Sequence, residues 1–178
     1  MVRHRASCSC GQVVLETEGK PMIAASCHCS DCQEAGRRFH EMAGAPGVLD
    51  ATAGTPLILF RKDRVRCLNG EALLEAHKLK AESPTYRAVA TCCNTPMFLN
   101  FTKGFWLSIF RDRFGPAAPP VTMRLMTAER PKGVTLPDDL PNHSRAPIRF
   151  ILTLMTTWAG MGFRTPKFPP SPVKSAGG

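Results

Sequence analysis

The sequence predicts a mainly β fold held together by metal ions bound to cysteines, with one helix near the C-terminus. The first 110 residues are a series of short β-branched or apolar runs separated by glycine and proline, which is typical of a chain of short strands. Seven of the eight cysteines lie in three short clusters, and such clustering favours metal binding over disulfide bonds. With 178 residues, the chain is long enough for one domain with a core and too short for two large ones.

Strands are expected wherever such a run lies between two breakers: residues 12–17, 22–26, 57–60, 64–68, 86–93, 97–99 and 105–110. Residues 33–56 contain four glycines and two prolines, which are too many breakers for a long helix. Residues 71–80 give conflicting signals. Their composition favours a helix, whereas the Asn69-Gly70 pair before them favours a β-hairpin.

The chain changes character after residue 114. Residues 115–147 read as a proline-rich linker in which residues 121–126 could add an edge strand. Residues 148–163 are predicted to form an amphipathic helix that begins after Pro147, because apolar side chains recur three and four residues apart: Ile148, Ile151, Leu152, Met155, Trp158 and Ala159. Residues 164–178 are expected to be a disordered tail.

The predicted helix is too short to span a membrane, since its uncharged stretch covers only residues 150–163. Its polar face is rich in threonine rather than in lysine and arginine, which is not the pattern of a helix that lies on a membrane surface. We therefore expect the helix to dock on the domain or on a partner subunit, in the latter case as the contact of a homodimer.

The net charge of +9 is concentrated in the second part of the chain. Residues 1–101 carry 12 basic and 10 acidic side chains, whereas residues 102–178 carry 11 and 4. The basic residues are scattered among prolines, so nucleic-acid binding is the least supported function and no such partner is expected. They fit a solvated surface, or a positive field that attracts an anionic thiol such as glutathione. No apolar signal segment precedes Cys8, so we expect a reducing, cytoplasmic location.

The most informative stretch is Cys27-His28-Cys29-Ser30-Asp31-Cys32. Its three thiolates fall within one tight turn, close enough to hold one metal ion, and zinc is the first candidate. Three protein ligands leave a fourth tetrahedral position for water or a substrate thiol, which is how catalytic zinc sites differ from closed structural ones. His28 or Asp31 could relay a proton there, or could only orient the ligands.

Three cysteine motifs follow one another along the chain: Cys8-Ser9-Cys10-Gly11, then Cys27-His28-Cys29-Ser30-Asp31-Cys32-Gln33, then Cys93-Asn94-Thr95-Pro96-Met97-Phe98. In order and separation they resemble the signature of the glutathione-dependent formaldehyde-activating enzyme (Gfa) family. The resemblance covers about residues 6–114. In particular, the chain is similar to an uncharacterised bacterial branch of that family, which has paired cysteines before the Thr-Pro turn and a basic C-terminal helix.

The resemblance implies a small zinc-pinned fold of twisted antiparallel sheets over residues 1–114, shared with methionine sulfoxide reductase B and a Rab exchange-accessory protein. It also implies two zinc sites. The structural site falls on Cys8, Cys10 and Cys93, and the catalytic site falls on Cys27, Cys29 and Cys32.

The chain departs from the family pattern at the structural site. The first cysteine of the family's CxxC motif would fall at Ala90, and Asn94 replaces the usual glycine. Asparagine tolerates the positive φ that the glycine would adopt, so the turn can persist. Cys92 is the first candidate for the fourth ligand, with Cys67 or water as alternatives, although two adjacent cysteines bind one ion only in an unusual turn.

Two functions fit these residues and the resemblance. The first is a carbon–sulfur lyase of the glutathione-dependent formaldehyde-activating type. There, zinc on Cys27, Cys29 and Cys32 deprotonates a thiol such as glutathione, whose thiolate adds to an aldehyde to give a hemithioacetal. The alternative is a non-catalytic binding or structural domain in which both zinc ions only stabilise the fold. The sequence alone does not decide between them, but a zinc ion at an open site would be the more labile of the two.

Overall fold

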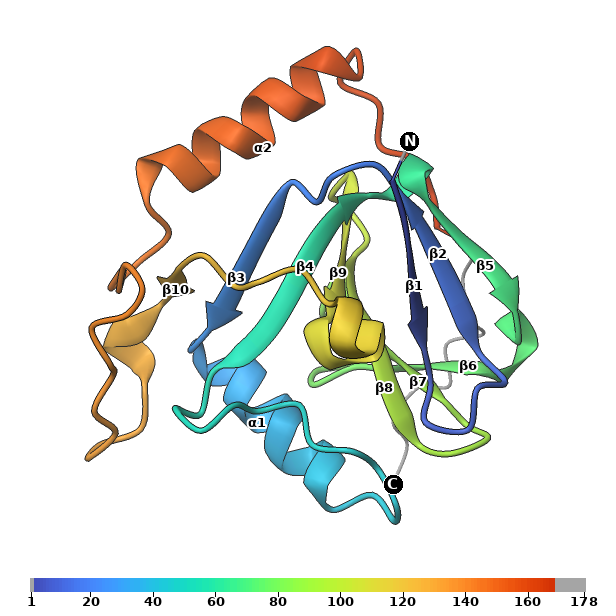
Figure 1. Ribbon diagram of the computed structural model, residues 1–178, viewed down its shortest axis with the longest axis horizontal. Helices are drawn as coiled ribbons and strands as arrows, with labels where there is room; N and C mark the ends of the chain where they lie inside the picture. Colours follow the sequence, from blue (N-terminus) through green and yellow to red (C-terminus); the bar gives the residue numbers. More distant parts are fainter. Residues whose placement is uncertain (1, 169–178) are drawn as a thin grey trace.

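The structure, a computed structural model, describes residues 2–168 and is built on two β-sheets (Figure 1). The smaller sheet has three antiparallel strands in the order β1 (Arg3–Ser7), β2 (Val14–Glu18) and β5 (Val65–Asn69). The larger sheet has seven strands in the order β10-β3-β4-β9-β8-β7-β6. Its pairs are antiparallel except that β10 runs parallel to β3, so the predicted mainly β fold is confirmed.

The larger sheet lies between two hydrophobic cores. Along its strand β4, Ile58 and Phe60 pack with the smaller sheet, whereas Leu57 and Leu59 pack with the helix α1 (Ser30–His40). This alternation is the two-residue period of a strand that is buried on both faces. The strands of this sheet are β3 (Ile23–Cys27), β4 (Thr55–Arg61), β6 (Leu74–His77), β7 (Thr85–Ala90), β8 (Thr95–Phe101), β9 (Trp106–Phe110) and β10 (Arg124–Leu125).

The helix α1 was not predicted, because residues 33–56 were judged to hold too many breakers. Its 11 residues end at His40, and the breakers begin to cluster only at Gly44. Gly36 lies inside the helix, where a Cβ atom would come within 2.5 Å of Cγ of Leu49. The glycine therefore allows the following loop to pass close to the helix.

The expected hairpin at Asn69-Gly70 is wrong, although the strand after it is present. Residues Glu71–Leu73 form a short 3-10 turn, and β6 follows it and pairs with β7. Since β5 belongs to the smaller sheet and β6 to the larger one, the turn connects two sheets. The pairing of β6 with β7 overrides the helical propensity of this segment.

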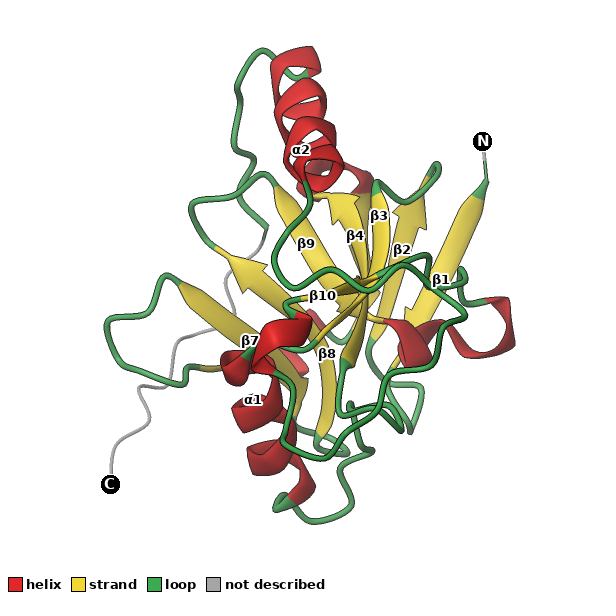
Figure 2. Cartoon of the chain, turned by 90° about the vertical axis from the view of Figure 1, so that its left-hand side faces the viewer, coloured by secondary structure: helices red, strands yellow, loops and turns green. Residues whose placement is uncertain are grey.

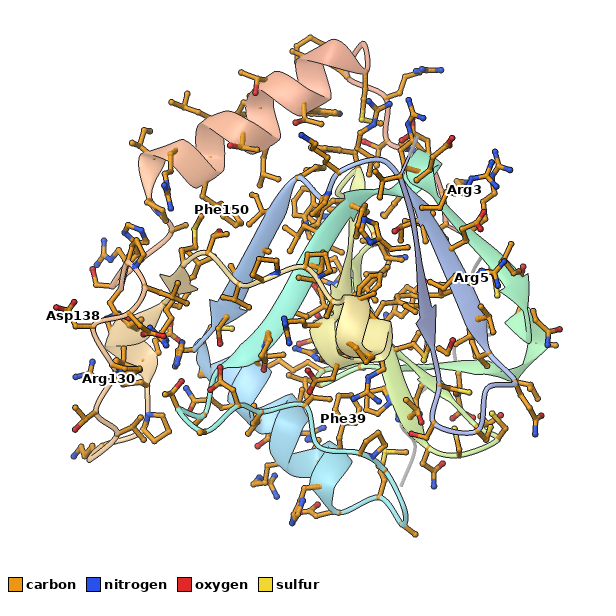
Figure 3. All side chains as sticks on the ribbon, viewed as in Figure 1. Arg3, Arg5, Phe39, Arg130, Asp138 and Phe150 are labelled. Atoms are coloured by element: carbon orange, nitrogen blue, oxygen red, sulfur yellow. The ribbon has the colours of Figure 1, made fainter. Side chains whose placement is uncertain are left out.

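The C-terminal helix α2 (Ile148–Gly160) begins after Pro147 as predicted, but it docks through a different side. Phe150 and Leu154 pack against the core shared with α1, and Phe150 lies on the side of α2 that faces the sheet (Figure 3). The ring of Trp158 stacks on Phe105 with 6.2 Å between centroids. Most of the predicted docking side is exposed to solvent, namely Ile148, Ile151, Leu152, Met155 and Ala159.

The helices α1 and α2 lie at opposite ends of the molecule (Figure 2). Among residues 2–168, no helix has both the length and the apolar character needed to cross a bilayer. Of the predicted tail, residues 169–178 lie outside the described residues. Phe168 is buried, with its ring centroid 5.3 Å from that of Phe98.

Candidate metal centres

The first candidate centre consists of the sulfurs of Cys27, Cys29 and Cys32, which all lie within 4.8 Å of one another. The strand β3 ends at Cys27, and α1 begins one residue after Cys29, so the strand-to-helix connection folds the three side chains together. Cys32 lies in the first turn of α1, where its amide donates a hydrogen bond to the carbonyl oxygen of Cys29. A helix N-terminus stabilises thiolates because its unpaired N–H groups carry partial positive charge.

The pKa values of the three thiols depend on one another because their sulfurs lie so close together. Hydrogen bonds from Cys27 and Cys32 lower the pKa of Cys29 to about 2, and the same contact with Cys29 raises the pKa of Cys27 to about 12. Contacts with both neighbours and burial raise the pKa of Cys32 as well. The contacts with its two neighbours thus favour the thiolate form of Cys29. A divalent cation that bound all three sulfurs would displace the remaining protons.

A buried arginine lies beside this centre, and the sequence analysis did not single it out. Arg87, from β7, is only 3% exposed, and its Nη2 donates a hydrogen bond to the carbonyl oxygen of Asp31 at 3.2 Å. Burial lowers the pKa of Arg87, whereas the charges of Cys32 and Asp31 oppose that shift. No described carboxylate forms an ion pair with it, and the negative charges that act on it are those of Cys32, Asp31 and Cys29. The sequence feature that could have identified Arg87 is that it is the single charged residue in a strand of mostly apolar residues.

Glu129, which follows β10, forms hydrogen bonds with the N-terminus of α1. The amide of Ser30 donates to Oε2 of Glu129 at 2.8 Å. Gln33 Nε2 donates to the carbonyl oxygens of both Glu129 (2.8 Å) and His28 (2.6 Å). Glu129 lies in the 3-10 turn Thr127–Glu129. A residue of the predicted linker therefore contacts the loop that carries the three cysteines.

His28 is fully buried and faces a polar network on the loop before β4. Its Nε2 lies 3.1 Å from Oγ1 of Thr52, and that hydroxyl donates to Oδ1 of Asp50 at 2.6 Å. Thr52 can therefore only accept, so His28 carries its proton on Nε2. This arrangement gives His28 a role in fixing the loop. Asp31, the other residue considered for proton relay, is exposed.

The second candidate centre consists of the sulfurs of Cys8, Cys10, Cys92 and Cys93, again within 4.8 Å of one another. The printed separations are 3.6 Å (Cys8–Cys10), 3.9 Å (Cys8–Cys92), 3.3 Å (Cys10–Cys92) and 3.8 Å (Cys92–Cys93). Four thiolates about 2.3 Å from one zinc ion, arranged tetrahedrally, lie about 3.8 Å apart. These four side chains could therefore hold one zinc ion with little movement.

The turn between β7 and β8 lets two adjacent cysteines point to one side. Cys92 and Cys93 lie in this turn, beyond the paired residues Ala90 and Thr95, so the alternation of a strand does not apply to them. Asn94 adopts a φ of 52° and donates from Nδ2 to the carbonyl oxygen of Ala43 at 2.9 Å. The asparagine thus takes the conformation for which the family uses glycine.

Cys67 does not belong to this group. It lies in β5, half-buried, and its thiol donates to the carbonyl oxygen of Asn69 at 3.1 Å. Of the two cysteines considered as the fourth ligand, Cys92 is therefore the one that the fold brings to Cys8, Cys10 and Cys93.

In the second centre the pKa values of two adjacent cysteines shift in opposite directions, and burial and contacts with Cys10 and Cys93 raise that of Cys92. Burial alone would raise the pKa of Cys93, but hydrogen bonds from Thr95 and from the backbone and thiol of Cys10 lower it to about 6. The guanidinium of Arg113 is buried nearby, and its charge interacts with those of Asp112, Cys93 and Cys8. Within residues 2–168, Arg113 forms no ion pair either. Each cysteine centre thus has one buried arginine close to it.

The two donor sets fit zinc in different ways. Four sulfurs close a tetrahedron, as in structural sites, whereas three sulfurs leave one position for another ligand. His28 is not among the residues whose ligand atoms gather at the three-cysteine centre.

Comparison with known proteins agrees with this geometry. The family model described as glutathione-dependent formaldehyde-activating enzyme matches residues 3–109, a range that includes both cysteine centres. No curated protein matches the chain. Among solved structures, a protein from Rhodobacter sphaeroides is similar over 65% of this chain and 91% of its own length, with 16% identity and a TM-score of 0.45. Glu129 lies outside the matched residues.

Proposed function

Since the chain belongs to the glutathione-dependent formaldehyde-activating enzyme family, we propose that it binds two zinc ions and acts as a carbon–sulfur lyase on a thiol–aldehyde adduct. The observation that carries this proposal is the difference in donor number between the two cysteine centres. Cys8, Cys10, Cys92 and Cys93 form a closed structural site, whereas Cys27, Cys29 and Cys32 form the catalytic site with one open position.

In the proposed reaction, a bond forms between the thiol sulfur and the carbonyl carbon of an aldehyde, and the thiol proton passes to the carbonyl oxygen. The lyase direction reverses both steps, so neither direction needs an oxidant or a reductant. Glutathione and formaldehyde are the substrates that the family description names. Zinc at the three-cysteine centre would supply a position where the substrate thiol ionises at neutral pH.

The residues of this chain have a defined task in that reaction. A substrate thiolate that joined three protein thiolates around a divalent cation would leave two negative charges in excess. The buried guanidinium of Arg87 places positive charge at this point and so favours the charged state, whereas the carboxylate of Glu129 offsets part of the positive end of α1. Glu129 and Gln33 fix the position of this helix end.

The alternative function is a non-catalytic domain in which both ions only stabilise the fold. In either case no cysteine is paired in a disulfide, which supports a reducing compartment such as the cytoplasm. The two functions differ in whether the three-cysteine centre exchanges its fourth ligand.

Elemental analysis, repeated in the presence of glutathione and a chelator, tests the metal assignment. We expect two zinc ions per chain, one of which exchanges. NMR of a mixture of formaldehyde and glutathione should then show that the protein accelerates formation of the S-hydroxymethyl adduct. Cys29→Ser should abolish the acceleration, whereas Cys67→Ser, outside both centres, should not. Two inert ions and no acceleration would leave the structural alternative.

A further inference from the structure

One side of α2 presents a stripe of long apolar side chains to solvent. The exposed fractions are 72% for Ile148, 42% for Ile151, 53% for Leu152 and 49% for Met155. Their spacing of three and four residues places them on one side of the helix, and we refer to these four residues as the outer stripe. Phe163, which follows the helix, is a further 59% exposed. Large exposed apolar side chains elsewhere in the described chain are isolated, such as Leu68 in β5.

The outer stripe cannot turn toward the domain, because the other side of α2 is already docked. Phe150 and Leu154 pack against the core, and Trp158 stacks on Phe105 with the two rings only 2° from parallel. Rotation of the helix would expose these side chains instead. The helix is therefore apolar on two sides, of which the domain covers one.

The charges that α2 and its flanking residues carry all have the same sign. Residues 140–168 contain four basic residues and no acidic residue. Arg145 precedes α2, Arg149 lies in its first turn with Nη2 4.0 Å from Sδ of Met123, and Arg164 and Lys167 follow its end. All four are exposed, and none forms an ion pair with a described residue. The stripe thus has basic side chains at both ends.

We propose that the outer stripe of α2 docks on the surface of an anionic lipid bilayer. Apolar side chains of a helix that lies flat enter the interface, and nearby arginine and lysine side chains reach the lipid phosphates. In the sequence, the threonine-rich polar side argued against membrane binding. In the fold, that polar side lies beside the outer stripe, and the basic side chains lie at the ends of the helix. A 13-residue helix does not span a bilayer, so the contact is with its surface.

A second copy of this chain is the less favourable occupant. Contact between two outer stripes would bring two sets of four basic side chains together, and residues 140–168 offer no carboxylate to compensate them. Anionic lipid supplies that compensation directly. This inference does not depend on the proposed lyase function.

Co-sedimentation of the full chain with vesicles tests the proposal. We expect binding to vesicles that contain phosphatidylglycerol, weak binding to pure phosphatidylcholine vesicles, and loss of binding at high salt. Leu152→Asp should weaken binding by about tenfold or more, because it places a charge in the apolar interface. Leu68→Asp, an equally exposed leucine on another face, is the matched control and should bind normally. Arg145→Gln combined with Arg149→Gln should weaken binding to the anionic vesicles only.

Three outcomes would overturn the proposal. Equal binding to neutral vesicles would remove the role of the four basic residues. Absence of vesicle binding, together with a dimer in light scattering that Leu152→Asp dissociates, would make a second copy the occupant. A monomeric protein that binds neither the anionic nor the neutral vesicles would show that the outer stripe does not contact lipid. Unchanged thermal melting of the Leu152→Asp variant verifies that any loss reflects the surface and not the fold.

Discussion

Arg87 donates a hydrogen bond from Nη2 to the carbonyl oxygen of Asp31, 3.2 Å away, and this bond ties β7 to the loop of the three-cysteine centre. The buried guanidinium lies where a cluster of thiolates needs a compensating charge. Arg113 is buried near the four-cysteine centre, and its charge interacts with those of Asp112, Cys93 and Cys8. Burial of an arginine that forms no ion pair is costly, and the negative charges that offset this cost are those of Asp31 and Asp112 together with those of the cysteines.

The first prediction concerns Arg87→Met, which keeps an unbranched apolar stem and removes the charged guanidinium. We expect zinc affinity at the three-cysteine centre to fall about 10- to 100-fold, as for other groups that support metal ligands. Competition with a chromophoric chelator measures this affinity. Arg87→Lys keeps the charge and should recover part of the loss. Equal zinc retention by the Met variant and the natural chain would contradict a compensating role.

The second prediction separates the cysteines of the closed site from the isolated one. Cys93→Ser removes one of four ligands, and we expect the loss of one zinc ion per chain and a large fall in melting temperature. The reason is that structural zinc supplies about 10 to 16 kcal/mol of binding free energy to small folds. Cys67→Ser changes only a thiol that donates to the carbonyl oxygen of Asn69, so its melting temperature should shift little. Unchanged melting of Cys93→Ser would show that the four sulfurs do not form a closed site.

Local sequence patterns predicted most strands because their signals are local. The apolar runs at residues 57–60 and 105–110 correspond to β4 and β9, where burial on the sheet agrees with β propensity. The helix α1 was missed even though its own signals are local too. Ser30 and Gln33 have the spacing of a capping box, and Glu34 pairs with Arg38 four residues later. The helix was not predicted because the glycines and prolines that follow it were taken as evidence against a helix in the whole of residues 33–56.

Other features could not be read from the sequence because they depend on packing. The cysteine motifs identified both centres, but only the fold brings Arg87 from β7 to the cysteine loop. Residues 74–77 form a strand because β7 lies beside them, against their helical propensity. Helix α2 has two apolar sides, and periodicity does not say which one faces the domain.

The third prediction concerns the turn that brings Cys92 and Cys93 together. Asn94 has a φ of 52°, a region in which residues with a Cβ atom are strained by about 1 to 2 kcal/mol. Asn94→Gly and Asn94→Ala both lose the hydrogen bond to the carbonyl oxygen of Ala43, so a comparison of the two isolates the backbone effect. We expect the Ala variant to be less stable than the Gly variant by about 1 kcal/mol in denaturant unfolding. Equal stability would mean that the turn does not hold Asn94 in this conformation.

The fourth prediction concerns the acid sensitivity of the loop before β4. Asp50 accepts hydrogen bonds from Ser26, from the backbone and hydroxyl of Thr52, and from the amide of Gly54. Burial opposes ionisation, but these bonds outweigh it and hold the pKa of Asp50 below its ordinary value. The folded state therefore favours the carboxylate. Its contribution to stability is complete above the unfolded pKa and disappears as the pH falls through the lower folded value.

We therefore expect Asp50→Asn to be less stable than the natural chain at pH 7, by about 1.5 to 3 kcal/mol for the loss of charged hydrogen bonds. The difference should shrink as the pH falls below about 4, where protonation removes the same charge from Asp50 in the natural chain. Denaturant unfolding of both proteins at a series of pH values measures it. Asp138→Asn, at an exposed aspartate far along the chain, is the control for a general charge effect. A difference that stays constant down to pH 3 would show that packing of the loop, and not the ionised carboxylate, stabilises the His28 network.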